Sequence, residues 1–171
     1  MYYRTFCCAS AALLCCGTAH ANPIKEIAGP VQQVQVVSDH DAVTTTVQCT
    51  DHYDNIPGAA LSITIPAGAS QLLVARFNGR VSALQSSGGN AGASVRMVVG
   101  TRELNPAGGL NVAAESSISF IQPPAQFERS GPISPGTHTV RAQFCVSGDN
   151  TSSATVRDWH FSIEAAAAAD H

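Results

Sequence analysis

The stretch QCTDHYDNIPG, residues 48–58, gathers side chains that could do chemistry. Asp51, His52 and Asp54 offer carboxylate and imidazole ligands for a cation, and Cys49 stands beside them. A calcium loop of the Asp-x-Asp type needs an oxygen ligand at its third position and a glutamate at its twelfth. Here a tyrosine and a serine occupy those positions, so that motif fails.

The same stretch also has a purely structural interpretation. Asp and Asn side chains bond backbone N–H groups in turns, Pro57 fixes φ, and Gly58 allows the chain to reverse into the next strand. We therefore favour a turn, and keep a weak cation site at Asp51, His52 and Asp54 as the alternative.

Motifs of known enzymes do not occur in the chain. It has no Gly-x-Ser-x-Gly, no His-Glu-x-x-His, no Cys-x-x-Cys and no glycine-rich phosphate loop. Carboxylates that could form a glycosidase-like pair lie in or near predicted loops, at Glu103, Glu115 and Glu128. The distance between them, which such a site depends on, does not follow from the sequence. We expect no catalytic residues and no cofactor; a secreted hydrolase whose site is built from loops is the alternative.

Residues 1–21 have the form of a secretory signal peptide. An early arginine precedes an uncharged run, and the segment ends in Ala-His-Ala at 19–21. We expect cleavage at this point and a secreted or periplasmic protein; a lipid on Cys15 or Cys16 is the alternative. No later segment reaches the roughly 20 apolar residues of a transmembrane helix.

Only two of the six cysteines, Cys49 and Cys145, lie outside the signal peptide. Two thiols in an exported protein predict one disulfide. Cys49 falls on the apolar parity of its strand and Cys145 on the polar parity, so a bond through the core is disfavoured. We predict a bond near the margin of a sheet, between neighbouring strands, with Cα atoms roughly 4.4 to 6.8 Å apart.

Apolar and polar residues alternate with a period of two between Gly, Pro, Asn and Asp, which predicts strands. The candidate strands are 31–37, 43–49, 60–65, 72–77, 80–84, 94–99, 116–121, 137–146 and 155–164, with a weaker one at 110–114. Nine or ten short strands predict an all-β, single-domain antiparallel β-sandwich or small barrel over 22–164. An Ala-rich tail follows at 165–171.

Two local features of these strands are specific enough to check. Asn78-Gly79 lies between two apolar runs, as in a type I′ hairpin turn, so Phe77 should face Arg80. In 137–146 the even-numbered residues from Val140 to Val146 should face the core. His138 should lie at the core's edge, bonding a backbone carbonyl.

The closing portion, residues 134–164, carries Gly-x-His-Thr-Val at 136–140 and Asp-Trp at 158–159. It resembles the last two strands of jelly-roll-like β-sandwich domains found in exported bacterial and phage proteins. The alternation in 155–164 predicts that Trp159, Phe161 and Ile163 are turned inward. The resemblance itself implies a jelly roll. It implies no functional residues.

Charge and composition limit the classes of ligand that the protein can bind. Nine basic and twelve acidic residues are scattered along the chain, so no basic stripe is available to nucleic acid or an anionic membrane. We expect a non-catalytic binding, adhesion or envelope-associated module for a protein or glycan ligand. Tyr53 is the only tyrosine beyond the signal peptide and Trp159 should lie in the core, so a sugar-binding module would have few exposed aromatic platforms. Asn150 begins a glycosylation sequon that counts only in a eukaryote.

Overall fold

The computed structural model describes residues 28–50, 52–69, 71–85, 91–105, 110–112 and 125–168. Its regular structure is β-strand throughout the described residues, as the alternating pattern predicts. The ten strands are β1 (Ala28–Asp39), β2 (Val43–Thr45), β3 (Asp54–Ile65), β4 (Gln71–Gln85), β5 (Gly92–Val99), β6 (Arg102–Glu103), β7 (Leu110–Val112), β8 (Ala125–Ile133), β9 (Gly136–Ser147) and β10 (Ser152–Ala168). The described part of the chain contains no apolar helix of membrane-spanning length.

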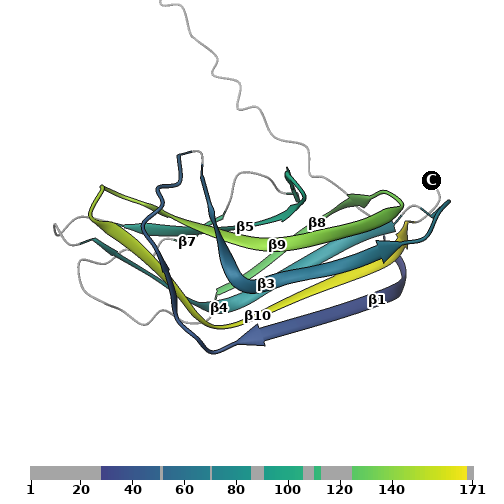
Figure 1. Cartoon of the computed structure of the whole chain (residues 1–171), viewed down its shortest axis with the longest axis horizontal. Helices are drawn as coiled ribbons and strands as arrows, with labels where there is room; N and C mark the ends of the chain where they lie inside the picture. Colours follow the sequence, from purple (N-terminus) through teal and green to yellow (C-terminus); the bar gives the residue numbers. More distant parts are fainter. Residues whose placement is uncertain are drawn as a thin grey trace, which may run out of the picture.

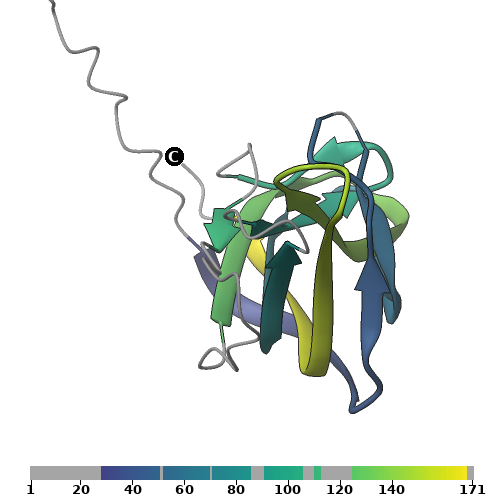
Figure 2. The same cartoon turned by 90° about the vertical axis from the view of Figure 1, so that its left-hand side faces the viewer.

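These strands form two five-stranded sheets that pack face to face (Figure 1). Sheet A has the order β1-β10-β4-β8, with β2 also paired to β10, and sheet B has the order β3-β9-β5-β6, with β7 paired to β5. The last two strands, β9 and β10, are each inserted between strands from earlier in the chain, and Figure 2 shows the end where one turns into the other. This is the arrangement of a jelly roll, so the predicted fold class is confirmed.

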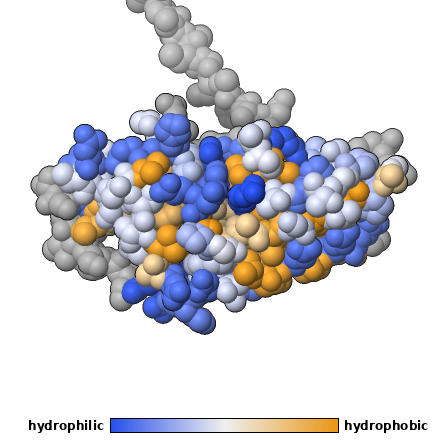
Figure 3. Space-filling model, viewed as in Figure 1, coloured by the Kyte–Doolittle hydropathy of each residue, from blue (hydrophilic) through white to orange (hydrophobic). Residues whose placement is uncertain are grey.

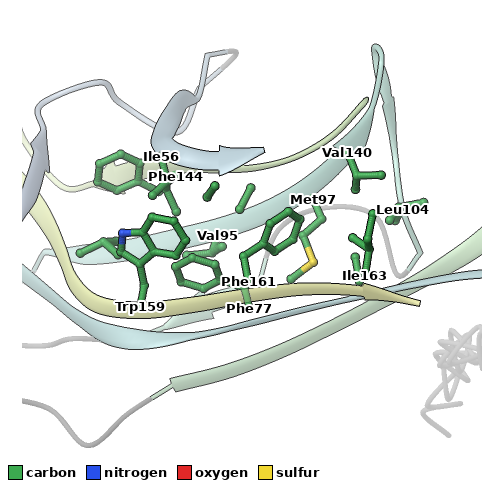
Figure 4. Close-up of a cluster of buried hydrophobic side chains, with 14 of the residues drawn as sticks. Ile56, Phe77, Val95, Met97, Leu104, Val140, Phe144, Trp159, Phe161 and Ile163 are labelled. Carbon is green, nitrogen blue, oxygen red and sulfur yellow. The ribbon is translucent and has the colours of Figure 1, made fainter. Parts of the chain in front are cut away.

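The core lies between the sheets, where side chains from both point toward one another (Figure 4). In β9, Val140, Ala142, Phe144 and Val146 are all buried, as their alternation predicts. From sheet A, Trp159 stacks on Phe77 with ring centroids 6.2 Å apart. Burying each large apolar side chain stabilises the fold by about 1.5 to 3 kcal/mol.

A β-bulge in β10 controls which of its residues face the core. Arg157 pairs with Arg80 and His160 with Asn78, so two residues, Asp158 and Trp159, lie opposite one residue of β4. Asp158 takes a positive φ of 49° there. The extra residue shifts the alternation by one, so that Val156 before the bulge and Trp159 after it are both buried.

The predicted hairpin at Asn78-Gly79 is wrong. Both residues lie inside the continuous strand β4, which pairs with β10 on one side and β8 on the other. Gly79 is opposite the bulge, and a Cβ added to it would lie 3.0 Å from Trp159 Cβ. Glycine is therefore required for the close approach of Trp159, and its φ is not positive.

The chain also does not reverse at Pro57-Gly58, contrary to the turn interpretation. Both residues lie within β3, in a bulge where the register with β9 shifts between Asn55 and Ala60. Gly58 takes φ 78°, which bends the strand without ending it. The bulge turns Ile56 into the core.

Other boundaries differ from the expected ones. β8 was not predicted, because its sequence AQFERSGPI mixes charges with glycine and proline. β10 runs beyond residue 164, and Ala165 and Ala166 are buried in it. The candidate strand 116–121 lies outside the described residues.

Hydrogen bonds link the two sheets along both edges of the sandwich. On one side Gln33 and Gln35 of β1 donate hydrogen bonds to the carbonyls of Thr64 and Ser62 in β3, at 2.8 and 2.7 Å. On the other side the segment after β6 meets β8, where the backbones of Asn105 and Ser130 exchange two hydrogen bonds. Each pair joins sheet A to sheet B.

The Cys49–Cys145 disulfide is present, with Cα atoms 5.1 Å apart. The chain leaves sheet A after β2 and crosses to sheet B, where Val47 and Cys49 bond the backbone of Val146. Phe144 points into the core, so its neighbour Cys145 points to the other face of β9. The disulfide therefore lies on the outer side of sheet B, between β9 and the segment that crosses to it. This confirms the predicted pairing. It also explains how Cys49 and Cys145 can be bonded although the sequence pattern places one on an apolar face and the other on a polar face.

Candidate functional site

The candidate cation ligands do not form a closed group in the described residues. Asp51 lies outside them, His52 is exposed, and Asp54 accepts a hydrogen bond from the hydroxyl of Thr45. Thr45 in turn accepts from the backbone N–H of Val47. No three His, Cys, Asp or Glu side chains come together as a metal site among the residues described. Asp54 thus fixes the crossing between the sheets.

Two other histidines have structural surroundings. His138 is half-buried, with its Nε2 2.9 Å from the carbonyl oxygen of Ser134, which confirms the predicted position at the edge of the core. His40 Nδ1 lies 3.5 Å from a carboxylate oxygen of Asp158 at the bulge, and Arg80 lies 3.6 Å from the other oxygen. His40 is almost fully exposed, so this ion pair contributes little to stability.

Two of the three candidate glutamates, Glu103 and Glu128, lie in different sheets. Glu103 is in β6, Glu115 lies outside the described residues, and Glu128 is in β8 of the other sheet. Asn150 of the sequon is exposed in the turn between β9 and β10.

A different set of side chains forms an organised site on the outer face of sheet B. We call Tyr53, Asn55, Arg96 and Gln143 the outer array. Tyr53 lies just before β3, Asn55 at the start of β3, Arg96 in β5 and Gln143 in β9. Strand register places them together, because Gln143 is the partner of Asn55 on one side and of Arg96 on the other. Strand pairing thus brings together residues 88 positions apart in the chain.

The members of the outer array hold one another in place. The guanidinium carbon of Arg96 lies 3.9 Å from the centroid of the Tyr53 ring, a cation–π contact. Arg96 Nε donates to Gln143 Oε1 at 2.8 Å, and Gln143 Nε2 donates to Asn55 Oδ1 at 2.9 Å. Both polar atoms of Gln143 are therefore used internally, and its rotamer is fixed.

These contacts leave specific groups for a ligand. The terminal nitrogens of Arg96, the amide nitrogen of Asn55 and the hydroxyl of Tyr53 have no hydrogen bond to any of the described residues. All three can donate hydrogen bonds. The array therefore presents hydrogen-bond donors on planar groups whose positions are already set.

The surface around the outer array is polar. Along β3 and β9, Ser62 meets Thr139 and Thr64 meets Thr137 through their hydroxyls. The large exposed apolar side chains among the described residues are three valines of β1 and Leu84 of β4, all in sheet A. Figure 3 shows apolar surface along the lower rim of the molecule, where β1 lies. The two sheets thus have different outer surfaces.

The sequence matches no family model and no curated protein. Among solved structures, the chain is similar to the C-terminal domain of EclA, described as a sugar-binding protein, with 10% identity and a TM-score of 0.42 over 72% of this chain and 78% of that one. It is also similar to PorU from Porphyromonas gingivalis, with 11% identity and a TM-score of 0.41, over 85% of this chain and 14% of that one.

A third similar structure is a family 35 carbohydrate binding module from Clostridium thermocellum. It has 13% identity and a TM-score of 0.35, over 75% of this chain and 97% of that one. These likenesses are too distant to transfer a ligand, and the function has to be argued from the surface of this chain.

Proposed function

We propose that this chain is an exported, non-catalytic β-sandwich module that binds a glycan on the outer face of sheet B. The outer array is the observation that carries the proposal. A ring, a guanidinium and two amides are held in place before any ligand arrives, so binding needs little further ordering of side chains. Sugar hydroxyls can accept hydrogen bonds from the donors of Arg96 and Asn55 and donate to carbonyl and hydroxyl oxygens.

The character of this face favours a glycan over a protein. Protein interfaces are usually centred on buried aromatic or apolar anchors. In the described residues, the large exposed apolar side chains all belong to sheet A, whereas the face of sheet B around the array carries hydroxyl, amide and guanidinium groups. A polar, donor-rich face matches a ligand made mainly of hydroxyl groups.

A binding role without catalysis follows from the groups in the array. None of Tyr53, Asn55, Arg96 and Gln143 is a histidine or a carboxylate, the side chains that most often act as general acid or base. Export is supported by the signal-peptide pattern of residues 1–21 and by the Cys49–Cys145 disulfide, which belongs to an oxidising compartment.

The test is a glycan array followed by calorimetry on the oligosaccharides that bind. Replacing Arg96 by glutamine removes the charged donor, and a charge-assisted hydrogen bond contributes about 1.5 to 3 kcal/mol. We therefore expect affinity to fall roughly 10- to 100-fold. Arg80→Gln in sheet A is the matched control and should bind like the wild type.

Two results would contradict the proposal. One is glycan binding that Arg96→Gln and Gln143→Ala leave unchanged, while both variants melt like the wild type. The other is that no oligosaccharide on the glycan array binds this protein, whereas a protein ligand is captured specifically and its capture depends on Arg96.

A further inference from the structure

A pocket lies at the end of the sandwich where β8 turns into β9. It has a volume of about 510 Å³ and is lined by Val99, Arg102, Pro132, Ile133, Ser134 and His138. Pockets for small molecules usually have volumes of about 300 to 1,000 Å³. None of these six residues belongs to the outer array, so the two sites are independent.

Arg102 is an exposed residue at the wall of this pocket. One of its terminal nitrogens donates to the carbonyl oxygen of Pro132. The guanidinium lies over Gly131, where an added Cβ would be 3.4 Å from Nη1. A glycine in β8 thus makes room for the guanidinium, and the remaining N–H groups of Arg102 have no hydrogen bond to the described residues.

His138 is oriented by a similar contact. Its Nε2 is 2.9 Å from the carbonyl oxygen of Ser134, and a carbonyl can only accept, so Nε2 carries the hydrogen. The carbonyl oxygens of Pro132 and Ser134 are therefore already occupied by the pocket's own donors. Among the residues that the structure describes, no aspartate or glutamate lines the pocket.

What remains for a ligand is a positive charge with several donors, next to an apolar wall. Val99, Pro132 and Ile133 form that wall. A carboxylate matches the fork of a guanidinium in geometry and charge. We propose that this pocket binds small organic monocarboxylates, with the carboxylate on Arg102 and a short apolar tail against Val99 and Ile133.

The experiment uses the full mature chain, sodium hexanoate as the probe and hexanamide as its uncharged counterpart. Binding is followed by NMR titration, which gives both the affinity and the amides that shift. We expect hexanoate to shift amides in 99–102 and 131–138 and to bind at least tenfold more tightly than hexanamide. Arg102→Gln should weaken hexanoate at least tenfold, and Arg80→Gln should not.

The proposal is overturned if hexanoate causes no shifts at these amides, if hexanamide binds equally well, or if a folded Arg102→Gln variant keeps the wild-type affinity. The comparison of the two probes on the wild type decides the question even if Arg102→Gln does not fold. Since no residue of the outer array is changed, failure here leaves the proposed glycan site standing, and the reverse also holds.

Discussion

Replacing Gly79 by alanine should destabilise the protein, although alanine is ordinarily the better residue in a strand. The added Cβ would lie 3.0 Å from Trp159 Cβ and 3.2 Å from Cε1 of Phe77. Carbon atoms normally approach to about 3.5 Å, so each contact is short by a few tenths of an ångström. Trp159 Cβ is attached to the backbone of the bulge and cannot move away without shifting β10.

The size of the effect follows from two opposing terms. Forcing an extra carbon into a packed core costs about 1 to 3 kcal/mol. Alanine also restricts the unfolded chain, which returns about 0.4 to 1 kcal/mol because the backbone at residue 79 suits alanine. The net loss in the free energy of unfolding should be about 1 to 2 kcal/mol.

Urea denaturation followed by tryptophan fluorescence measures this loss directly, since Trp159 is the only tryptophan. Gly131→Ala is the matched control. Its Cβ would be 3.3 Å from Leu104 Cδ2 and 3.4 Å from Arg102 Nη1, which are the ends of side chains and can move. We expect a smaller loss there. If Gly79→Ala is as stable as the wild type, the close approach of Trp159 is not what requires a glycine.

Four further outcomes are expected. Replacing both Cys49 and Cys145 by alanine should lower the free energy of unfolding by about 2 to 4 kcal/mol, and a reductant should no longer affect the variant's denaturation curve. Asp158→Val should cost about 1 to 2 kcal/mol, because a β-branched residue resists positive φ, whereas Asp158→Gly should be close to neutral; equal stability of the two would contradict the bulge geometry. Mass spectrometry of the exported protein should show a chain beginning at Asn22, and a chain retaining the first methionine would refute the cleavage site. Calcium, zinc and chelator should leave the melting temperature unchanged, since residues 51–54 are interpreted as structural; a rise with either metal would revive the cation site.

Several features of the fold could be read from the sequence because they are local. The alternation in 137–146 and around Trp159 gives the buried faces of β9 and β10 directly. The pairing of Cys49 with Cys145 follows once residues 1–21 are set aside as a predicted signal peptide, because only these two cysteines lie beyond them. The alternation is complete within one short segment, and each cysteine has only one possible partner.

The errors in the fold come from contacts with distant residues. Asn78-Gly79 has the composition of a turn. Glycine is needed at residue 79, however, because Trp159, far away in sequence, packs so close that a Cβ would clash with it. Pro57-Gly58 likewise looks like a reversal and is a bulge set by pairing with β9. A sequence gives the residues that permit a turn, and the neighbouring strands decide whether the chain turns.

The outer array was missed for the same reason. Gln143 lies on the polar face of its predicted strand, and Arg96 lies within the predicted strand 94–99, so both were available as exposed residues. Their contact depends on the register between β5 and β9, and that of Asn55 on the register between β3 and β9. Nothing in a single sequence specifies these registers, so no motif linked the residues to one another.

Gln33 and Gln35 of β1 also bear on how the protein avoids self-association. An edge strand with open carbonyls is a template on which a strand from another molecule can add, and such additions can grow into aggregates. Gln33 and Gln35 already occupy the carbonyls of Thr64 and Ser62 on the edge of β3. An incoming strand would have to displace both amides before it could pair there. The side chains that join the two sheets therefore also act as a guard against intermolecular strand addition.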